Sequence, residues 1–245
     1  MSNGKTNNMI EIRGLMKKFG RREVLKGIGF SAGAGEPITL LGPNGAGKST
    51  LMNMITGYLA PSSGDVFILG RNIRDNPLSA KASVGFLPEG APLYPDLSVR
   101  DFLRYMAELR GLPAARIAEA AETANVTQVL QQKIETLSKG YLRRVGFAQS
   151  ILSNPPVLLL DEPTDGLDPN QKAHIRSLIN QMGQEKTILI STHLLEEAET
   201  VCSRIILMNR GKIMADGSCA EIIARSGGKT LAEAFRKLTV SEEEN

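Results

Sequence analysis

Short apolar runs alternate along this chain with longer stretches in which apolar and polar residues are mixed. Mostly apolar runs occupy residues 37–41, 157–160 and 187–191, and each ends at a glycine or a polar residue. Such runs are typical of parallel strands that are buried on both faces of a sheet. Residues 169–182 and 194–200 are predicted to form helices after the second and third runs. This alternation of strand and helix predicts an α/β fold.

Other segments have a strand-like pattern without a helix between them. Residues 9–12 alternate between the two faces, residues 24–25 lead into a second strand, and Phe30 lies on the next short run. A turn at residues 209–211 separates two apolar runs and predicts a hairpin. The remaining strand-like runs are residues 66–69, 84–87, 205–208 and 212–214.

Residues 89–153 interrupt this alternation with a helical pattern. Ser98 and Asp101 have the spacing of a capping box and predict a helix that continues to about Leu109. Further helices are predicted at residues 114–124 and 126–132. We therefore expect one domain over residues 1–245, with a core at 8–88 and 154–217, a helical insert at 89–153 and a helical tail at 218–245.

A glycine-rich loop follows the first apolar run and matches the pattern G-x-x-x-x-G-K-[ST]. Its glycines let consecutive backbone N–H groups turn inward around an anion, and the helix behind it adds unsatisfied N–H groups. A lysine in this position reaches the β- and γ-phosphates, and the next hydroxyl reaches Mg²⁺. The loop therefore predicts a nucleoside triphosphate site made by Gly42, Pro43, Asn44, Gly45, Ala46, Gly47, Lys48, Ser49 and Thr50.

Two later strands end in residues that fit the same chemistry. Asp161 and Glu162 follow residues 157–160, where Asp161 can hold Mg²⁺ and Glu162 can polarise an attacking water. An Asp-Glu-Pro sequence is also common in surface turns, and the glycine-rich loop favours the functional interpretation. His193 follows the strand at 187–191 and can reach a γ-phosphate, although a lone histidine is more often structural.

Two helix starts allow either a structural or a functional interpretation. Ser138 and Gly140 begin a helix that runs to about Leu152, where a hydroxyl and a glycine can form a second anion site. Ser138 can equally be a simple helix cap. Asp168 precedes Pro169 and by itself is explained as a helix cap.

Composition excludes several classes of protein. The 29 Lys and Arg residues nearly balance 26 Asp and Glu residues, so no broad basic surface predicts a nucleic-acid partner. No apolar run approaches the roughly 18 residues of a membrane helix, and the polar residues 2–8 lack the pattern of a signal peptide. Cys202 and Cys219 have no metal-binding spacing and are predicted to be free thiols. A cytoplasmic protein is expected.

These motifs, in this order, resemble the ATP-binding cassette of ABC transporters over about residues 9–216. Residues 42–50 match Walker A, and residues 157–163 match Walker B with its catalytic glutamate at Glu162. Residues 137–141 resemble the signature sequence. The remaining matches are the D-loop at residues 166–168, the switch histidine at His193 and an adenine-stacking ring at Phe19.

Two departures separate this chain from the usual family pattern. Lys139 and Tyr141 replace the third and fifth residues of the signature, while Ser138 and Gly140 remain. Glu89 stands where the family has the Q-loop glutamine, and its carboxylate could meet Mg²⁺ or a water bound to it. These variants resemble the ATPases of exporters that carry drugs, polysaccharides or gliding-related cargo.

The resemblance implies a P-loop NTPase with a RecA-like core sheet, an N-terminal antiparallel β subdomain and the helical insert. It also implies a head-to-tail dimer in which ATP and Mg²⁺ lie between Walker A of one copy and Ser138 of the other. A separate membrane permease would hold the dimer at the inner face of the membrane and contact Leu93, Tyr94 and Pro95. The alternatives are an ABC ATPase that acts without a permease, for example in cofactor assembly, and a non-enzymatic nucleotide-gated regulator.

Overall fold

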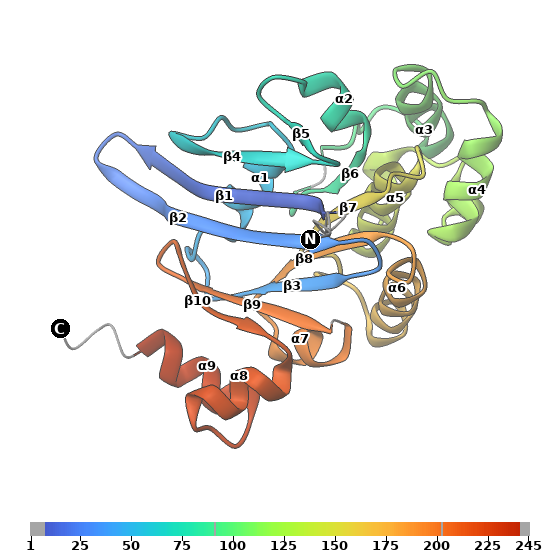
Figure 1. The fold of residues 1–245 in the computed structure, drawn as a ribbon. Helices are drawn as coiled ribbons and strands as arrows, with labels where there is room; N and C mark the ends of the chain where they lie inside the picture. Colours follow the sequence, from blue (N-terminus) through green and yellow to red (C-terminus); the bar gives the residue numbers. More distant parts are fainter. Residues whose placement is uncertain (1–7, 91, 202, 241–245) are drawn as a thin grey trace.

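The computed structural model describes residues 8–90, 92–201 and 203–240 (Figure 1). The polar start at 1–7, Cys202 and the acidic end at 241–245 lie outside the described residues. Cys219 is a free thiol. Within the described ranges no helix is both long enough and apolar enough to cross a lipid bilayer.

Two sheets form the framework. The central sheet has the order β10-β9-β3-β8-β7-β6, and neighbouring strands are parallel except for the antiparallel hairpin of β9 and β10. Its strands are β3 (Pro37–Leu41), β6 (Val84–Leu87), β7 (Val157–Asp161), β8 (Thr187–Thr192), β9 (Arg204–Asn209) and β10 (Lys212–Gly217). The predicted strands at 37–41, 157–160 and 187–191 and the hairpin are confirmed.

An antiparallel sheet lies over one face of the central sheet (Figure 1). Its order is β2-β1-β4-β5, with β1 (Asn8–Phe19), β2 (Arg22–Gly33), β4 (Ser63–Ile68) and β5 (Arg71–Asn72). The prediction that Phe30 lies on a separate run from residues 24–25 was wrong, because β2 continues through both. Register shifts along the β1–β2 pair let these long strands bend without breaking.

Helices cover the central sheet and fill the connections between its strands. The glycine-rich loop leads into α1 (Lys48–Ile55), and the chain between β6 and β7 is largely helical. The helices after α1 are α2 (Pro77–Ala82), α3 (Val99–Glu108), α4 (Ala115–Thr123), α5 (Lys139–Ile151), α6 (Pro169–Met182), α7 (Leu195–Val201), α8 (Cys219–Ser226) and α9 (Leu231–Val240), with short 3₁₀ turns at Thr127–Val129 and Ile134–Thr136.

The start of α3 explains one success and one error of the sequence-based prediction. Ser98 caps α3 as expected, since its Oγ accepts a hydrogen bond of 3.0 Å from the Asp101 N–H. The helix predicted at residues 126–132 is wrong and reduces to the 3₁₀ turn Thr127–Val129. The carbonyls of Leu130 and Gln132 accept instead from the first N–H groups of α3. A helix end that needs partners has thus taken the backbone groups of the neighbouring segment.

The core is divided by the central sheet into two apolar layers. Leu158 and Leu160 of β7 point into the layer shared with α3, α4 and α5. Val157 and Leu159 alternate into the layer between the two sheets, which also contains α1. Alternate side chains of one strand therefore stabilise both layers, as the continuous apolar pattern predicted.

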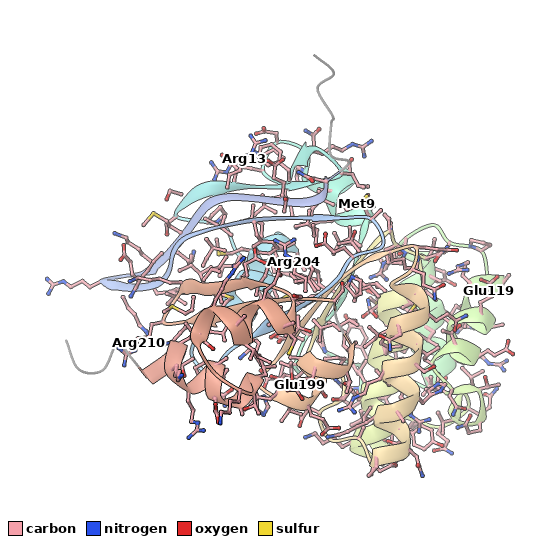
Figure 2. All side chains as sticks on the ribbon, turned by 60° about the horizontal axis from the view of Figure 1, so that its bottom comes forward. Met9, Arg13, Glu119, Glu199, Arg204 and Arg210 are labelled. Atoms are coloured by element: carbon pink, nitrogen blue, oxygen red, sulfur yellow. The ribbon has the colours of Figure 1, made fainter. Side chains whose placement is uncertain are left out.

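Arg204 on β9 connects the two sheets at their edge. Figure 2 shows it between the antiparallel sheet and the β9–β10 hairpin. Its guanidinium donates to the Ser31 carbonyl of β2 at 2.8 Å, to Glu36 at 2.9 Å and to both carboxylate oxygens of Asp216 on β10. These hydrogen bonds raise the pKa of Arg204, and hydrogen bonds to charged groups of this kind fix geometry well.

A buried carboxylate lies behind the carboxyl ends of β7 and β8. Glu197 on α7 accepts a hydrogen bond of 2.7 Å from the Thr192 hydroxyl and a second from Thr164. Burial raises the pKa of Glu197 above its ordinary value of 4.5, although the Thr192 hydrogen bond acts in the opposite direction. The side chain joins α7 to both strand ends through polar contacts.

Gly85 is the point at which β6 meets the end of α5. A Cβ atom there would overlap the Ser150 carbonyl and would lie 2.7 Å from carbons of Leu158 and Pro155. We expect Gly85→Ala to lower the free energy of unfolding by about 1–3 kcal/mol, because backbone cannot move aside as a flexible side chain can. Chemical denaturation measures this. Gly29→Ala on β2 is the control, since its Cβ would come no closer than 3.5 Å to any neighbour, and an equal loss in both variants would contradict the prediction.

Glu197→Gln is expected to change the pH dependence of stability. Because the pKa of Glu197 is raised in the folded chain, the folded state binds more protons than the unfolded state once the pH passes the unfolded value. The wild type therefore loses stability at this site as the pH rises from about 4.5, and the variant does not. Denaturation measured from pH about 4.5 to about 8 should show that the free energy of unfolding of the variant rises relative to that of the wild type. A difference in stability between variant and wild type that stays constant over this pH range would contradict the prediction.

Candidate nucleotide site

The glycine-rich loop joins β3 to α1 and is held from behind by β9 and β10. Gly42 lies so close to the Met208 carbonyl that a Cβ atom could not fit. The Gly211 N–H donates to the Ala46 carbonyl at 3.0 Å. Gly47 caps α1 with φ 103, and its missing Cβ would lie 2.7 Å from Leu25. Only glycine combines this backbone conformation with this close approach.

Lys48 is buried at the start of α1 and folds back into the loop. Its Nζ donates to the carbonyls of Gly42 at 2.7 Å and Pro43 at 3.2 Å. Burial lowers the pKa of the Lys48 ammonium, while the negative charges of Glu162, Asp161 and Glu89 raise it. The lysine is thus a buried cation close to three carboxylates, with neutral carbonyls as its direct acceptors.

Glu162 stands directly after β7 in an unusual backbone conformation. Its φ of 50 is rare for a residue with a side chain, and its N–H donates to the Ser191 carbonyl at 2.8 Å. Its Oε1 lies 2.8 Å from Nδ1 of His193, and Thr192 lies 3.4 Å from the other oxygen. Strain of about 1–3 kcal/mol at such a residue persists only where surrounding contacts hold it.

A cavity of about 580 Å³ collects most of the predicted site residues. Phe19 at its mouth is 51% exposed and lies under the Lys17 ammonium, which is 5.0 Å from the ring centre. The ring is therefore available at the surface and is not a core residue. The predicted residues that line the cavity are Phe19, Asn44, Gly45, Gly47, Lys48, Ser49, Thr50, Glu89, Glu162 and His193.

The cavity also contains residues that the sequence did not single out. Arg22 and Val24 reach it from β2, and Asp165 reaches it from the loop after β7. The Lys139 ammonium donates to Asp165 at 2.8 Å and lowers the pKa of that carboxyl. Asp165 follows Asp161 and Glu162 closely in the sequence, and this position was a signal for its placement, whereas no local pattern indicated Arg22.

Several predicted residues lie outside the cavity lining. Gly42, Pro43 and Ala46 form the back of the loop, and Asp161 is buried at the end of β7. The remaining three, Ser138, Gly140 and Asp168, belong to separate helix starts. Ser138 accepts a 3.4 Å hydrogen bond from the Tyr141 N–H, and Asp168 accepts one of 2.9 Å from the Gln171 N–H. Both act as helix caps in this chain.

The chain is similar in sequence to proteins of one family along most of its length. The family model described as ABC transporter matches residues 25–165. The linearmycin resistance ATP-binding protein LnrL of Bacillus subtilis is 35% identical over 238 residues, which are 95% of this chain and 75% of that protein. The Nod factor export ATP-binding protein I of Ralstonia nicotianae is 35% identical over 232 residues, which are 93% of this chain and 72% of that protein.

Solved structures share the fold. An ATP-binding subunit of an ABC transporter superposes with a TM-score of 0.87 at 29% identity and covers 94% of this chain and 99% of its own. A dimeric, post-hydrolysis ATP-binding cassette with ADP and Pi bound has a TM-score of 0.77 at 26% identity, covering 86% and 98%. With its phosphate loop, strand-end carboxylates and matching fold, the chain belongs to the ABC transporter ATP-binding family and is an ATPase of the P-loop NTPase fold.

Proposed function

We propose that this chain binds ATP with Mg²⁺, forms a head-to-tail dimer with a second cassette and drives export through a separate membrane permease. The observation that carries the proposal is the approach of the Lys48 loop to Glu162 and His193 around one cavity. The names of the similar proteins, which refer to Nod factor export and linearmycin resistance, support export as the direction.

The loop residues fit a triphosphate. Gly45, with φ 81, and Gly47 turn the backbone around the start of α1, where N–H groups and the helix dipole favour an anion. The hydrogen bonds of the Lys48 ammonium described above go to neutral carbonyls, so phosphate oxygens would give it a directly hydrogen-bonded anion. Phe19 and Val24, which both line the cavity, offer an apolar surface for the adenine ring of ATP.

The oxygen ligands near the loop fit Mg²⁺. Ser49, Asp161 and Glu89 offer one hydroxyl and two carboxylates, which are the hard ligands that this ion prefers. Within the described ranges no three His, Cys, Asp or Glu side chains converge as a metal cage. We therefore expect these few protein groups to share the ion with phosphates and water. When bound, Mg²⁺ neutralises charge on the β- and γ-phosphates.

Glu162 is the residue that we assign as general base. Its carboxylate is nearly buried, so few waters compete for it, and His193 at 2.8 Å fixes one of its oxygens. General-base help of this kind contributes about 10²–10⁴ in rate. His193, which is more exposed, would also reach the γ-phosphate from the cavity wall.

The dimer follows from residues that do not reach the cavity of their own chain. Ser138 and Gly140 stand at the start of α5, where the helix dipole and free N–H groups favour an anion. A second copy placed head to tail would bring this helix start, and Asp168 of the D-loop, over the nucleotide of the first. The similar cassette solved as a dimer supports this arrangement.

An apolar groove of about 860 Å³ between α2, β6 and α3 is the surface that we assign to the permease. Leu78 and Leu109 on its rim are 85% and 64% exposed. Exposed apolar surface of this extent marks a protein contact. The segment that we expected to contact the permease lies beside it: Pro92 lines the groove, while Leu93 and Pro95 line a smaller neighbouring cavity. Docking here would hold the chain at the cytoplasmic face of the membrane.

An ATPase that works without a permease, as in cofactor assembly, is the alternative. It would need no apolar docking groove, so the groove favours the permease. A regulator that binds ATP without hydrolysis is disfavoured, because Glu162 and His193 are already in contact.

Glu162→Gln is expected to reduce ATP hydrolysis by at least about 100-fold while ATP still binds, because the amide cannot accept a proton. With Mg²⁺ and ATP the variant should accumulate as a dimer, since the γ-phosphate that joins the two copies stays uncleaved. Phosphate release and analytical ultracentrifugation measure these results. The exposed Glu185→Gln should hydrolyse ATP as the wild type does. Unchanged hydrolysis in Glu162→Gln would contradict the assignment of Glu162 as general base. A variant that stays strictly monomeric, alone and with its permease, would contradict the proposed dimer.

Leu78→Glu and Leu109→Glu are expected to weaken permease binding, because each places a charge on the apolar rim of the groove. Tagged chains are recovered from solubilised membranes of their own cells, and the membrane-spanning protein that is recovered with them is quantified. Its yield should fall at least about tenfold, which corresponds to about 1.4 kcal/mol, while ATP hydrolysis by the purified chain stays unchanged. Gln181→Glu, on the exposed face of α6, is the control. Recovery of no membrane-spanning protein with the wild type would favour the alternative function.

A further inference from the structure

Arg143 on α5 connects three segments around the nucleotide site. One nitrogen of its guanidinium donates to the carbonyls of Pro88 at 2.6 Å and Glu89 at 2.9 Å, just after β6. A second nitrogen, Nη2, donates to the carbonyls of Asp161 and Glu162 at the end of β7, the latter at 2.6 Å. A single side chain from α5, the helix that begins within the signature-like residues 137–141 (the signature helix), thus holds the backbone at the ends of β6 and β7.

The side chain is enclosed and its charge is retained by its surroundings. Arg143 is 6% exposed, and its burial lowers the pKa of its guanidinium. The negative charges of Asp161, Asp165, Glu162 and Glu89 act in the opposite direction. Arginine suits this place because its planar group directs several donors at once, whereas a lysine ammonium is a point charge.

The contact to Glu162 matters because that backbone is strained. The N–H of Glu162 is fixed by the Ser191 carbonyl, and its φ of 50 must be held against relaxation. Its carbonyl accepts from Arg143 and also from the Asp165 N–H at 3.1 Å. Arg143 therefore holds the carbonyl of Glu162 in place, and a rotation of that peptide group would move the Glu162 carboxylate.

We propose that Arg143 is a positioning residue that fixes Glu162 and Glu89 relative to the signature helix. Through it, the helix that would cap the nucleotide of a second copy is attached to the base and to the Q-loop position of its own copy. The inference rests on the proposed role of Glu162 as base. It assigns a task to a residue that the motifs of the sequence do not identify.

Arg144 provides a matched control on the same helix. It is 5% exposed, and it donates to the Asn125 carbonyl at 2.9 Å. Its guanidinium lies 4.1 Å from the centre of the Tyr141 ring. These contacts stay among residues between β6 and β7, away from the strand ends. The two arginines are buried to a similar extent, so Arg144→Gln shows what the loss of a buried arginine on α5 does without loss of the contacts to the strand ends.

The test compares Arg143→Gln, Arg143→Lys and Arg144→Gln in the full chain, by kcat, ATP affinity and thermal stability. We expect Arg143→Gln to lower kcat about 100-fold, the loss that follows when a reacting group is displaced by about 1 Å, with ATP affinity within about twofold of wild type. Arg143→Lys should recover part of kcat. Arg144→Gln should lose thermal stability but keep kcat within about threefold of wild type.

Hydrogen exchange gives a second measurement. The peptide that contains Glu162 should exchange faster in Arg143→Gln and in Arg143→Lys, and at the wild-type rate in Arg144→Gln. If Arg143→Gln does not fold, the lowered kcat of Arg143→Lys at unchanged ATP affinity carries the test.

Two results would overturn the inference. Equal kcat in Arg143→Gln and Arg144→Gln would show that Arg143 is structural only, and a loss of ATP binding in both Arg143 variants would place its role in binding. Neither result bears on the base itself, which Glu162→Gln tests separately.

Discussion

The register of the three parallel strands β3, β8 and β7 is the constraint on which the site depends. Leu41 pairs with Thr192, and Asp161 pairs with Ser191, so these strands end at one level. The glycine-rich loop follows Leu41 directly. His193 is the next residue after Thr192, and Glu162 is the next residue after Asp161. A shift of register would separate Lys48 from Glu162, and the apolar layers on both faces of the sheet hold the register in place.

Around that sheet edge, polar contacts restrain backbone that would otherwise relax. Glu162 is held through its N–H by Ser191, through its carbonyl by Arg143 and through its carboxylate by His193. Behind it, Glu197 joins Thr164 and Thr192 and so ties α7 to the same two strand ends. Hydrogen bonds of this kind order a site before its substrate arrives, which lowers the reorganisation needed during reaction.

The molecule also separates two kinds of surface. The cavity at Lys48 is polar and lined by the ends of core strands, whereas the groove beside β6 is apolar and lined partly by α3. Residues 88–90 pass between them: Glu89 lines the cavity, Pro88 lines the groove, and Arg143 holds both carbonyls. Residues 88–90 and the Arg143 side chain therefore connect the cavity and the groove directly.

The sequence by itself determined the parts that depend on local pattern. Apolar runs gave the buried strands, Ser98 gave the cap of α3, and the spacing of Gly42, Gly47 and Lys48 gave the phosphate loop, because each reflects neighbouring residues. The tertiary structure decided what depends on distant partners. The carbonyls of Leu130 and Gln132 accept from the first N–H groups of α3, and the segment predicted as a helix at 126–132 forms only the 3₁₀ turn Thr127–Val129. Arg143 lies 18 and 19 residues from the Asp161 and Glu162 carbonyls that it holds, and 55 and 54 from those of Pro88 and Glu89, a relation that no local pattern encodes.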